Sequence, residues 1–310
     1  MIITMPILAL LLLLMPISTS YAQSFTLMSW NMQWLSLNST SPVVRSKADY
    51  QALQQIFTSH APDILAFQEV DSIAALYHVI NRQHYNIYFS SRMNNHQDSF
   101  KKNNQYTGFA VKKAIVVDNL NDLSQLSSPP ISTGRRAYFN NKLRYGSVIK
   151  ITIDNQPIIL LNLHLKSGCF SGKQLAQQQR RSCKILAQQL KLIKQWINTQ
   201  QAVSPTLIIV GDFNHRITSN NKFINQITDN QIRLNHISAS IKANCTVRLT
   251  TKISQYRTYT SLIDHLFTTT NVKALSQRQI QYNKQQLSQF TLSDHCPLLF
   301  RLLIDYENKK

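Results

Sequence analysis

The chain has 310 residues, of which 43% are hydrophobic, and it carries a formal net charge of +19 at neutral pH. The apolar fraction is large enough to build a buried core, which excludes a disordered polyelectrolyte. Lys and Arg number 33 against 14 Asp and Glu, and this surplus favours anionic partners such as nucleic acid or anionic lipid head groups.

The first 22 residues are predicted to be a signal peptide. They contain no charged side chain, and residues 6–17 form an apolar run. This run is shorter than the roughly 20 residues that a membrane-spanning helix needs. Small residues, Ser20 and Ala22, occupy positions −3 and −1 before the expected cleavage point. We therefore expect an exported protein, secreted or periplasmic. An uncleaved membrane anchor is the alternative, because no Lys or Arg precedes the apolar run.

Strands and helices are predicted to alternate from Phe25 to the end of the chain. The strands are expected at residues 25–30, 64–67, 148–153, 158–163, 207–210, 262–268 and 297–303. Apolar residues at helical spacing predict helices over residues 44–60 and from about 173 to 200. The polar segment 91–105 is expected to be an exposed loop. No repeat, linker or break in composition divides residues 23–310, so we expect a single catalytic domain there.

The chain has four cysteines, an even number that predicts disulfides in an exported protein. We expect a bridge between Cys169 and Cys183, which lie close in sequence. Cys183 precedes Leu186 by three residues on the expected buried face of the long helix. Cys245 and Cys296 can form a second bridge or remain buried free thiols.

Polar side chains capable of chemistry gather where the predicted strands end or begin. They are Asn31, Glu69, His164, Lys166, Asp212, Asn214, Asp264, His265, Asp294 and His295. Active sites of layered α/β proteins form at strand ends, because the sheet holds loops from distant parts of the sequence in fixed positions. Any one of these residue types alone is more often an ordinary loop or core residue. The evidence for an active site therefore comes from their order along the chain and from the motifs around them.

Six motifs follow one another along the chain. They are Ser-Trp-Asn-Met-Gln (29–33), Phe-Gln-Glu-Val (67–70), Leu-Asn-Leu-His-Leu-Lys-Ser (161–167), Gly-Asp-Phe-Asn (211–214), Ile-Asp-His (263–265) and Ser-Asp-His-Cys-Pro-Leu (293–298). In this order the chain resembles the endonuclease/exonuclease/phosphatase superfamily, which includes deoxyribonuclease I-like nucleases, neutral sphingomyelinases and inositol polyphosphate 5-phosphatases. The resemblance covers residues 25 to about 303. It implies a four-layer α/β sandwich, in which two mixed β-sheets pack face to face with helices outside.

The resemblance also implies a metal-dependent hydrolysis of phosphodiester bonds. It places Asn31 and Glu69 at a Mg²⁺ ion, for which Mn²⁺ or Ca²⁺ can substitute, and Asp294 is a further acidic group near that position. Mg²⁺ prefers oxygen ligands and keeps several waters, so few protein ligands are needed.

The remaining motif residues are expected to act on the phosphate and on the attacking water. His295 is expected to be a general base or an electrostatic partner of the phosphate, with Asp264 fixing its tautomer. His164 would reach the phosphate from the other side. Asp212 and Asn214 match the residues that orient the water and bind the phosphate. The sequence leaves open whether Asp212 or His295 removes the proton.

Three residues near these motifs have no clear place in the family pattern. Some related nucleases pair the first histidine with an upstream acidic residue, and here segment 91–105 offers only Asp98, which we do not expect to serve. His215 and His265 adjoin catalytic motifs, and we expect both to be structural.

The sequence favours a nucleic-acid substrate, DNA or RNA. Basic pairs occur at residues 101–102, 112–113, 135–136 and 180–181, as suits an enzyme that follows a phosphate backbone. Tyr138 and Tyr145, near Arg144, can supply base stacking or be ordinary strand aromatics. A sphingomyelinase-like or phosphoinositide phosphatase-like enzyme on anionic phospholipid is the first alternative, although no run of exposed aromatics suggests a membrane-inserting hairpin. A non-catalytic basic binding protein is the second. We expect a monomer.

Overall fold

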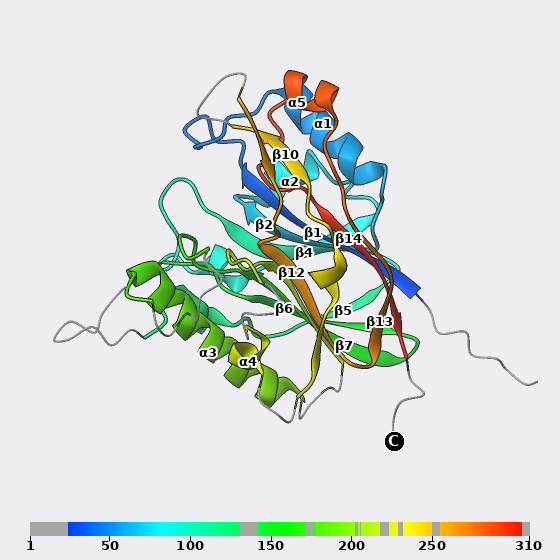
Figure 1. Cartoon of the computed structure of the whole chain (residues 1–310). Coiled ribbons are helices and arrows are strands. Elements are labelled where there is room, and N and C mark those ends of the chain that lie inside the picture. The colour runs from blue at the N-terminus through cyan, green and yellow to red at the C-terminus, as the bar shows by residue number, and fades with distance from the viewer. Residues whose placement is uncertain are drawn as a thin grey trace, which may run out of the picture.

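Two six-stranded mixed sheets pack face to face in the computed structural model of the chain, with helices on both outer faces (Figure 1). The structure describes residues 24–130, 142–170, 175, 178–201, 204, 206–217, 223–228, 232–249 and 255–305. The predicted signal peptide lies outside these ranges. Within them, no helix is long and apolar enough to cross a membrane.

Each sheet contains one parallel pair of strands at its centre. The first sheet has the order β13 (Val272–Gln279), β14 (Leu298–Ile304), β1 (Ser24–Leu35), β2 (Ile64–Val70), β4 (Tyr106–Lys112) and β3 (Tyr85–Phe89). The second has the order β5 (Val116–Asn119), β6 (Ser147–Ile153), β7 (Gln156–His164), β8 (Leu207–Asp212), β12 (Asp264–Thr269) and β9 (Leu234–His236). Only β1–β2 and β7–β8 pair in parallel among these strands. A separate ribbon joins β10 (Cys245–Arg248) to β11 (Tyr256–Tyr259).

Three apolar layers hold the sandwich together and confirm the predicted four-layer fold. Leu27, Ile149 and Phe300 belong to the layer between the two sheets. The outer face of the first sheet packs against α1 (Lys47–Thr58), α2 (Ile73–Tyr77) and α5 (Lys284–Gln289). The outer face of the second packs against α3 (Arg181–Gln201) and α4 (Ile224–Ile227), which lie together at the bottom of Figure 1. The central strands β2, β7, β8 and β12 therefore bury both faces, as their apolar runs require, whereas the edge strands β13 and β5 stay largely exposed.

The strand pairing brings the predicted site residues to one end of the sandwich. The carboxyl ends of β1, β2, β7 and β8 carry Asn31, Glu69, His164 and Asp212. β12 runs antiparallel to β8, so its first residue, Asp264, lies opposite Asp212. β14 runs antiparallel to β1, which brings the segment that precedes it to the same end. Residues that lie far apart in sequence thus meet in space.

Several predicted elements differ in their bounds from the structure. The long helix, predicted from residue 173, begins at Arg181. The apolar side chains that face the sheet begin only at Cys183, and the preceding segment is rich in Gln and Arg. The strand predicted at 262–268 begins at Asp264, and β1 continues beyond Trp30 to Leu35. The strands predicted at 148–153 and 158–163 pair as an antiparallel hairpin, with its turn at Asp154 and Asn155, both of which have positive φ angles.

Segment 91–105 is not simply the exposed loop that its polar composition predicts. It contains the short 3₁₀ helix η1 (Ser91–Asn94), and it buries Arg92 and Asn104. The guanidinium of Arg92 packs over the rings of Phe100 and Tyr106, with ring-centroid distances of 5.7 and 5.4 Å. The polar composition of the segment did not predict this burial, because cation–π contacts and backbone carbonyls replace the water around the arginine.

Both pairs of cysteines form disulfides. The predicted Cys169–Cys183 bridge is present and ties the first turn of α3 to the loop after β7. Cys245 and Cys296, which the sequence left undecided, form the second bridge. This second bridge attaches the β10–β11 ribbon to the residue that follows His295.

Candidate active site

The site begins with Asn31 and Glu69, at the ends of the parallel strands β1 and β2. The Nδ2 atom of Asn31 donates to Glu69 Oε1 and to Asp212 Oδ2, at 3.1 Å each. Its Oδ1 atom accepts the Gln33 N–H at 3.0 Å, and Glu69 Oε2 accepts the Trp34 N–H at 3.1 Å. Both side chains are therefore fixed by the left-handed turn at Gln33 and Trp34, near the end of β1.

Asp212 and Asn214 form the part of the site contributed by β8. Asp212 is buried and accepts two hydrogen bonds from Asn214, one from its backbone N–H at 2.8 Å and one from Nδ2 at 2.9 Å. Burial raises the pKa of Asp212 to about 7, and the positive charge of His295 opposes that rise. A carboxylate that titrates near neutral pH can take up a proton during a reaction.

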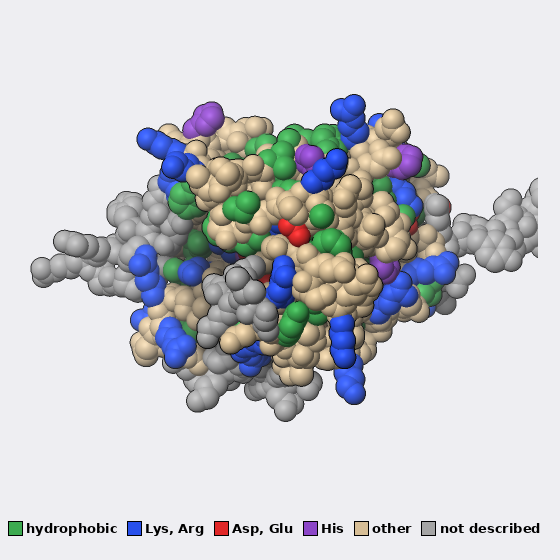
Figure 2. Space-filling view, turned by 90° about the horizontal axis from the view of Figure 1, so that it is seen from above, with side chains coloured by type: hydrophobic (Ala, Val, Ile, Leu, Met, Phe, Trp, Pro, Cys, Tyr) green, Lys and Arg blue, Asp and Glu red, His purple; other side chains and the backbone are tan. Residues whose placement is uncertain are grey.

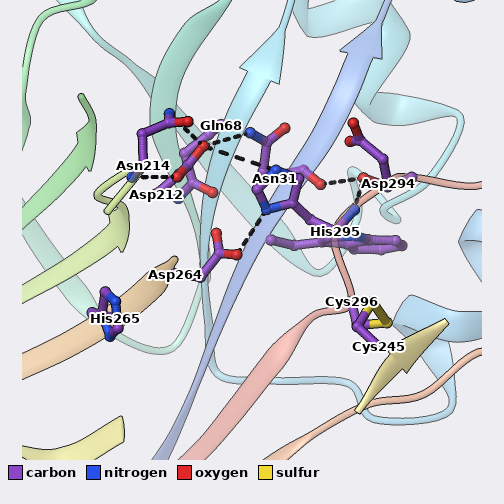
Figure 3. A network of polar contacts seen from close by, with 12 residues as sticks. Asn31, Gln68, Asp212, Asn214, Cys245, Asp264, His265, Asp294, His295 and Cys296 are labelled. Carbon is purple, nitrogen blue, oxygen red and sulfur yellow. Dashed lines mark hydrogen bonds and ion pairs between the residues drawn. A yellow bond between two sulfur atoms is a disulfide. The ribbon is translucent and has the colours of Figure 1, made fainter. Parts of the chain in front are cut away.

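His295 and Asp264 form a close pair on the other side of Asp212 (Figure 3). His295 Nδ1 lies 2.7 Å from Asp264 Oδ2, and its Nε2 lies 3.9 Å from Asp212 Oδ2. Burial opposes a charge on His295, but Asp264, Asp212 and Asp294 together raise its pKa well above the usual value. The imidazole is therefore protonated at neutral pH, with both ring nitrogens acting as donors.

His164 reaches the same carboxylates from the end of β7. Its Nε2 atom lies 3.5 Å from Glu69 Oε1 and 3.6 Å from Asp212 Oδ2. Burial, reinforced by nearby Arg144 and His295, lowers the pKa of His164 well below its usual value. Its Nδ1 atom is buried without a hydrogen-bond partner in the described part of the chain. This histidine is therefore neutral.

Two of the uncertain sequence candidates have structural roles. Asp98 does not pair with His164, because its carboxylate accepts from the Tyr145 hydroxyl at 2.6 Å. Tyr145 is buried and is not available for stacking on a base. Tyr138 and the 135–136 pair lie outside the described residues. Lys166 is half-buried, and its ammonium donates to the Ser167 carbonyl at 3.0 Å.

His215 and His265 belong to a buried cluster beneath the site, in keeping with the structural role predicted for them. His265 Nε2 donates to the His215 carbonyl at 3.0 Å, and His236 Nε2 lies 3.1 Å from His265 Nδ1. His215 Nδ1 donates to the Cys169 carbonyl at 2.6 Å. Burial lowers the pKa of His265 to about 3 and that of His236 to about 4, so both rings are neutral at pH 7.

A half-buried cation, Arg144, adjoins the site and was not predicted as part of it. Its Nη2 atom donates to the Leu165 carbonyl at 3.0 Å, and the same oxygen accepts from Asn214 Nδ2. Burial lowers the pKa of Arg144 to about 10, against the opposing effect of Glu69 and Asp212. Arg144 therefore keeps its charge at neutral pH. The sequence signal for it was weak, since nothing in a single arginine before a strand shows burial.

Gln68 and Asn162 fix the two sheets to each other below the site. Asn162 on β7 donates from Nδ2 to the carbonyls of Phe67 and Gly108 in the other sheet, at 2.8 and 2.7 Å. Its Oδ1 atom accepts from Gln68 Nε2 at 2.7 Å. Gly211 lies against this contact, because a Cβ atom there would come within 2.1 Å of the Leu163 carbonyl oxygen. The glycine of the Gly-Asp-Phe-Asn motif is therefore required, because a larger residue would collide with β7.

The oxygen-rich part of the site fits a hard divalent cation. Glu69 and Asn31 offer the carboxylate and amide oxygens that Mg²⁺ prefers, and Glu69 keeps 14% of its side chain exposed. The carboxylate of Asp294 points away from Asp264 in Figure 3. Asp212, Asp264 and His295 also place ligand atoms within 4.8 Å of one another, the one such group in the described ranges. His295 Nδ1 already forms a hydrogen bond with Asp264. We therefore interpret the Asp212–Asp264–His295 group as a cluster that holds a proton rather than a metal ion.

Comparison with known proteins agrees with this geometry. A sequence profile of the Endonuclease/Exonuclease/phosphatase family matches residues 28–295, which include every site residue from Asn31 to His295. The chain belongs to this family. Members of the family are phosphoric ester hydrolases and generally depend on a divalent metal. No curated protein sequence matches the chain.

Solved structures of other family proteins share the fold at low sequence identity. A family protein from Bacteroides thetaiotaomicron is 15% identical, with a TM-score of 0.61 over 93% of this chain and 100% of that one. Danio rerio TDP2 in complex with a single-strand DNA product is 16% identical, with a TM-score of 0.59 over 90% and 98%. A mannosyl-6-phosphatase from B. thetaiotaomicron is 14% identical, with a TM-score of 0.58 over 90% and 100%. These likenesses establish the fold alone.

Proposed function

We propose that the protein is an exported, metal-dependent phosphodiesterase that hydrolyses nucleic acid. The observation that carries this proposal is the single network in which Asn31 bonds both Glu69 and Asp212, with His295 beside them. A carboxylate with a pKa of about 7, a protonated imidazole and a neutral histidine meet at one end of the sandwich. This combination suits attack of water on phosphorus.

In this proposal Asp212 takes the proton from the attacking water. Its carboxylate titrates near neutral pH and is held by Asn214, so it is positioned as well as basic. The raised pKa of His295 means that its imidazole is already protonated and cannot serve as the base at neutral pH. We therefore propose Asp212, rather than His295, as the base.

The other polar groups would stabilise the charge that develops on the phosphate oxygens. His295, held by Asp264, presents an imidazolium Nε2–H toward Asp212, and Arg144 adds a second fixed cation. His164, neutral, presents its Nε2–H as a hydrogen-bond donor. A divalent cation held by Glu69 and Asn31, with Asp294 as a further carboxylate, would supply Lewis-acid neutralisation of the phosphate when bound.

Nucleic acid is the substrate class that the charge of the chain favours. The net charge of +19 is far beyond what a small neutral substrate requires. On the face shown in Figure 2, Lys and Arg side chains are widely spread, whereas few acidic side chains are visible. The shared fold with a protein solved in complex with a single-strand DNA product supports the same choice.

A substrate panel tests the proposed function. Purified residues 23–310 with Mg²⁺ are incubated with single-stranded DNA, plasmid DNA, RNA, sphingomyelin vesicles, phosphoinositide vesicles and mannose 6-phosphate. We expect cleavage of at least one nucleic acid, with no release of phosphate from mannose 6-phosphate. Hydrolysis confined to the vesicles would replace the proposal with the phospholipid alternative. If no substrate in the panel is hydrolysed, the proposal is wrong and the remaining alternative is a non-catalytic basic binding protein.

A further inference from the structure

Arg45 is a buried arginine that precedes α1 and lies behind the site. Only 8% of the residue is exposed, and no carboxylate in the described part of the chain forms an ion pair with it. Instead its guanidinium donates five hydrogen bonds, all to backbone carbonyls. The acceptors are Thr291 (from Nε, 3.1 Å), Gln33 and Trp34 (from Nη1, 2.9 and 3.4 Å), and Met32 and Leu292 (from Nη2, 3.1 and 2.8 Å).

Three of these carbonyls belong to the turn that orients Asn31 and Glu69. Gln33 and Trp34 have φ angles of 44° and 52°, a left-handed conformation that residues with side chains rarely adopt. The left-handed turn directs successive carbonyls to one point, where their dipoles would repel each other without a cation. The N–H groups of the same two residues donate to Asn31 Oδ1 and Glu69 Oε2.

The other two carbonyls belong to the segment that leads into His295. This segment also contacts the turn directly, since Ser293 Oγ donates to the Asn31 carbonyl at 2.6 Å. The Asp294 N–H donates to Gln33 Oε1 at 3.1 Å. Arg45 is therefore the one side chain in the described ranges whose hydrogen bonds reach the carbonyls of both segments.

We propose that Arg45 is a positioning residue that holds the Asn31–Glu69 turn and the His295 segment in register through its five carbonyl contacts. The planar guanidinium has five N–H donors in a fixed fork, so it can join two segments at once. A lysine has three donors on one atom and can satisfy one segment or part of both. Arg45 does not touch the reacting groups and acts through the residues it holds. The kinetic part of this inference rests on the proposed function.

The test compares Arg45→Met and Arg45→Lys with a matched control, Arg248→Met. Arg248 donates to Thr291 Oγ1 at 3.1 Å and to the Ser288 carbonyl at 3.4 Å, so it contacts the same segment but not the turn. Two readouts are used on the full mature chain. The first is kcat and KM on single-stranded DNA. The second is amide hydrogen exchange at Trp34 and Asp294, whose N–H groups report the turn and the contact between the segments.

We expect Arg45→Met to lower kcat by about 30-fold or more with KM changed less than about threefold, because misplaced groups cost rate rather than substrate binding. Exchange at both amides should rise by about tenfold or more, because the turn and the segment then open locally. Arg45→Lys should give intermediate values of kcat and exchange. Arg248→Met should match the wild type within about twofold in each measurement.

Three results would overturn the inference. They are a folded Arg45→Met protein with wild-type kcat and exchange, a loss of kcat with unchanged exchange, and Arg45→Lys equal to the wild type in both. If Arg45→Met does not fold, Arg45→Lys is judged by the same criteria. If neither folds while Arg248→Met does, Arg45 serves folding and the positioning role is wrong. If the wild type hydrolyses no phosphoric ester, the proposed function fails, whereas the exchange comparison still decides the role of Arg45.

Discussion

The two histidines at this site have opposite protonation, and an aspartate between them titrates near neutral pH. Burial raises the pKa of Asp212 to about 7, although the charge of His295, with Nε2 3.9 Å away, opposes the rise. His295 has a carboxylate 2.7 Å from Nδ1, so it stays charged, whereas burial, reinforced by Arg144 and His295, keeps His164 neutral. Environment rather than residue type divides the roles.

A double-mutant cycle tests whether His295 and Asp264 act as one unit. If Asp264 only orients and charges the imidazole, His295→Ala and Asp264→Ala remove the same contribution. Each single change should lower kcat by about 10²–10⁴-fold, which is typical of acid–base and charge-stabilising groups. The double variant should be little slower than His295→Ala. If the two losses multiply in full, Asp264 has a separate role at the metal or in the structure.

The residues that sequence analysis could name are those whose motif fixes their position in the chain. Asn31, Glu69, His164, Asp212, Asn214 and Asp264 all come to one place, as their positions at the strand ends led us to expect. Arg45 and Arg144 escaped notice because the groups that satisfy them are backbone carbonyls. Those of Thr291 and Leu292 lie 246 and 247 residues from Arg45 in sequence. A charged residue is ordinarily exposed. A buried one is recognised only when its hydrogen-bond partners, here distant in sequence, are known.

At the scale of elements, the buried histidines join β9, β12 and the loop after β8. His236 and His265 have folded-state pKa values of about 4 and about 3, below the ordinary value of 6.5. Between these values and 6.5 the unfolded chain binds more protons than the folded one. The free energy of unfolding should therefore fall as the pH falls below 6.5, by up to about 1.4 kcal/mol per pH unit for each histidine.

Urea unfolding between pH 7 and pH 4 measures this dependence. We expect His236→Gln to reduce the slope of the unfolding free energy with pH, because one of the histidines with a lowered pKa is removed. The matched control is His84→Gln, at an exposed position outside the cluster, which should keep the wild-type slope. Equal slopes in His236→Gln and in the wild type would show that the cluster does not contribute to acid sensitivity.

The elements themselves were predictable where local pattern alone sets them. β6 and β7 have continuous apolar runs around a two-residue turn, and both were predicted within two residues. The β10–β11 ribbon was missed, although Cys-Thr-Val-Arg in β10 alternates between apolar and polar side chains; Tyr-Arg-Thr-Tyr in β11 does not. Each of its strands has only four residues, and the Cys245–Cys296 bridge anchors the ribbon to the segment that carries His295. This anchor could not be predicted because the sequence left the pairing of Cys245 and Cys296 undecided.

At the scale of the whole molecule, the positive charge should make substrate binding strongly dependent on salt. Lys101 and Lys102 are exposed. They lie near the site, because the N–H of Asn104, two residues after Lys102, donates to Asp71, two residues beyond Glu69. Replacing both lysines by alanine should weaken binding of single-stranded DNA. It should also reduce the slope of log K against log salt by about 1.4, because each phosphate contact on a single strand contributes about 0.7.

Lys273→Ala is the control for this measurement. Lys273 pairs with Asp305, and it lies beside Leu303 at the opposite end of β14 from the site. We expect its slope to equal that of the wild type. A slope that does not change in the Lys101–Lys102 variant would place the nucleic-acid path elsewhere on the surface.

The Asn31–Glu69–Asp212–His295 network is proposed to hydrolyse phosphodiester bonds in nucleic acid. Cleavage of single-stranded DNA in the presence of Mg²⁺ by the wild type and by Glu69→Gln tests this proposal. The amide keeps the shape of the side chain but loses the charge that would hold the cation. We predict cleavage by the wild type and a loss of about 100-fold or more in Glu69→Gln, with an unchanged unfolding transition. Equal cleavage by the two proteins, or none by the wild type, would contradict the claim.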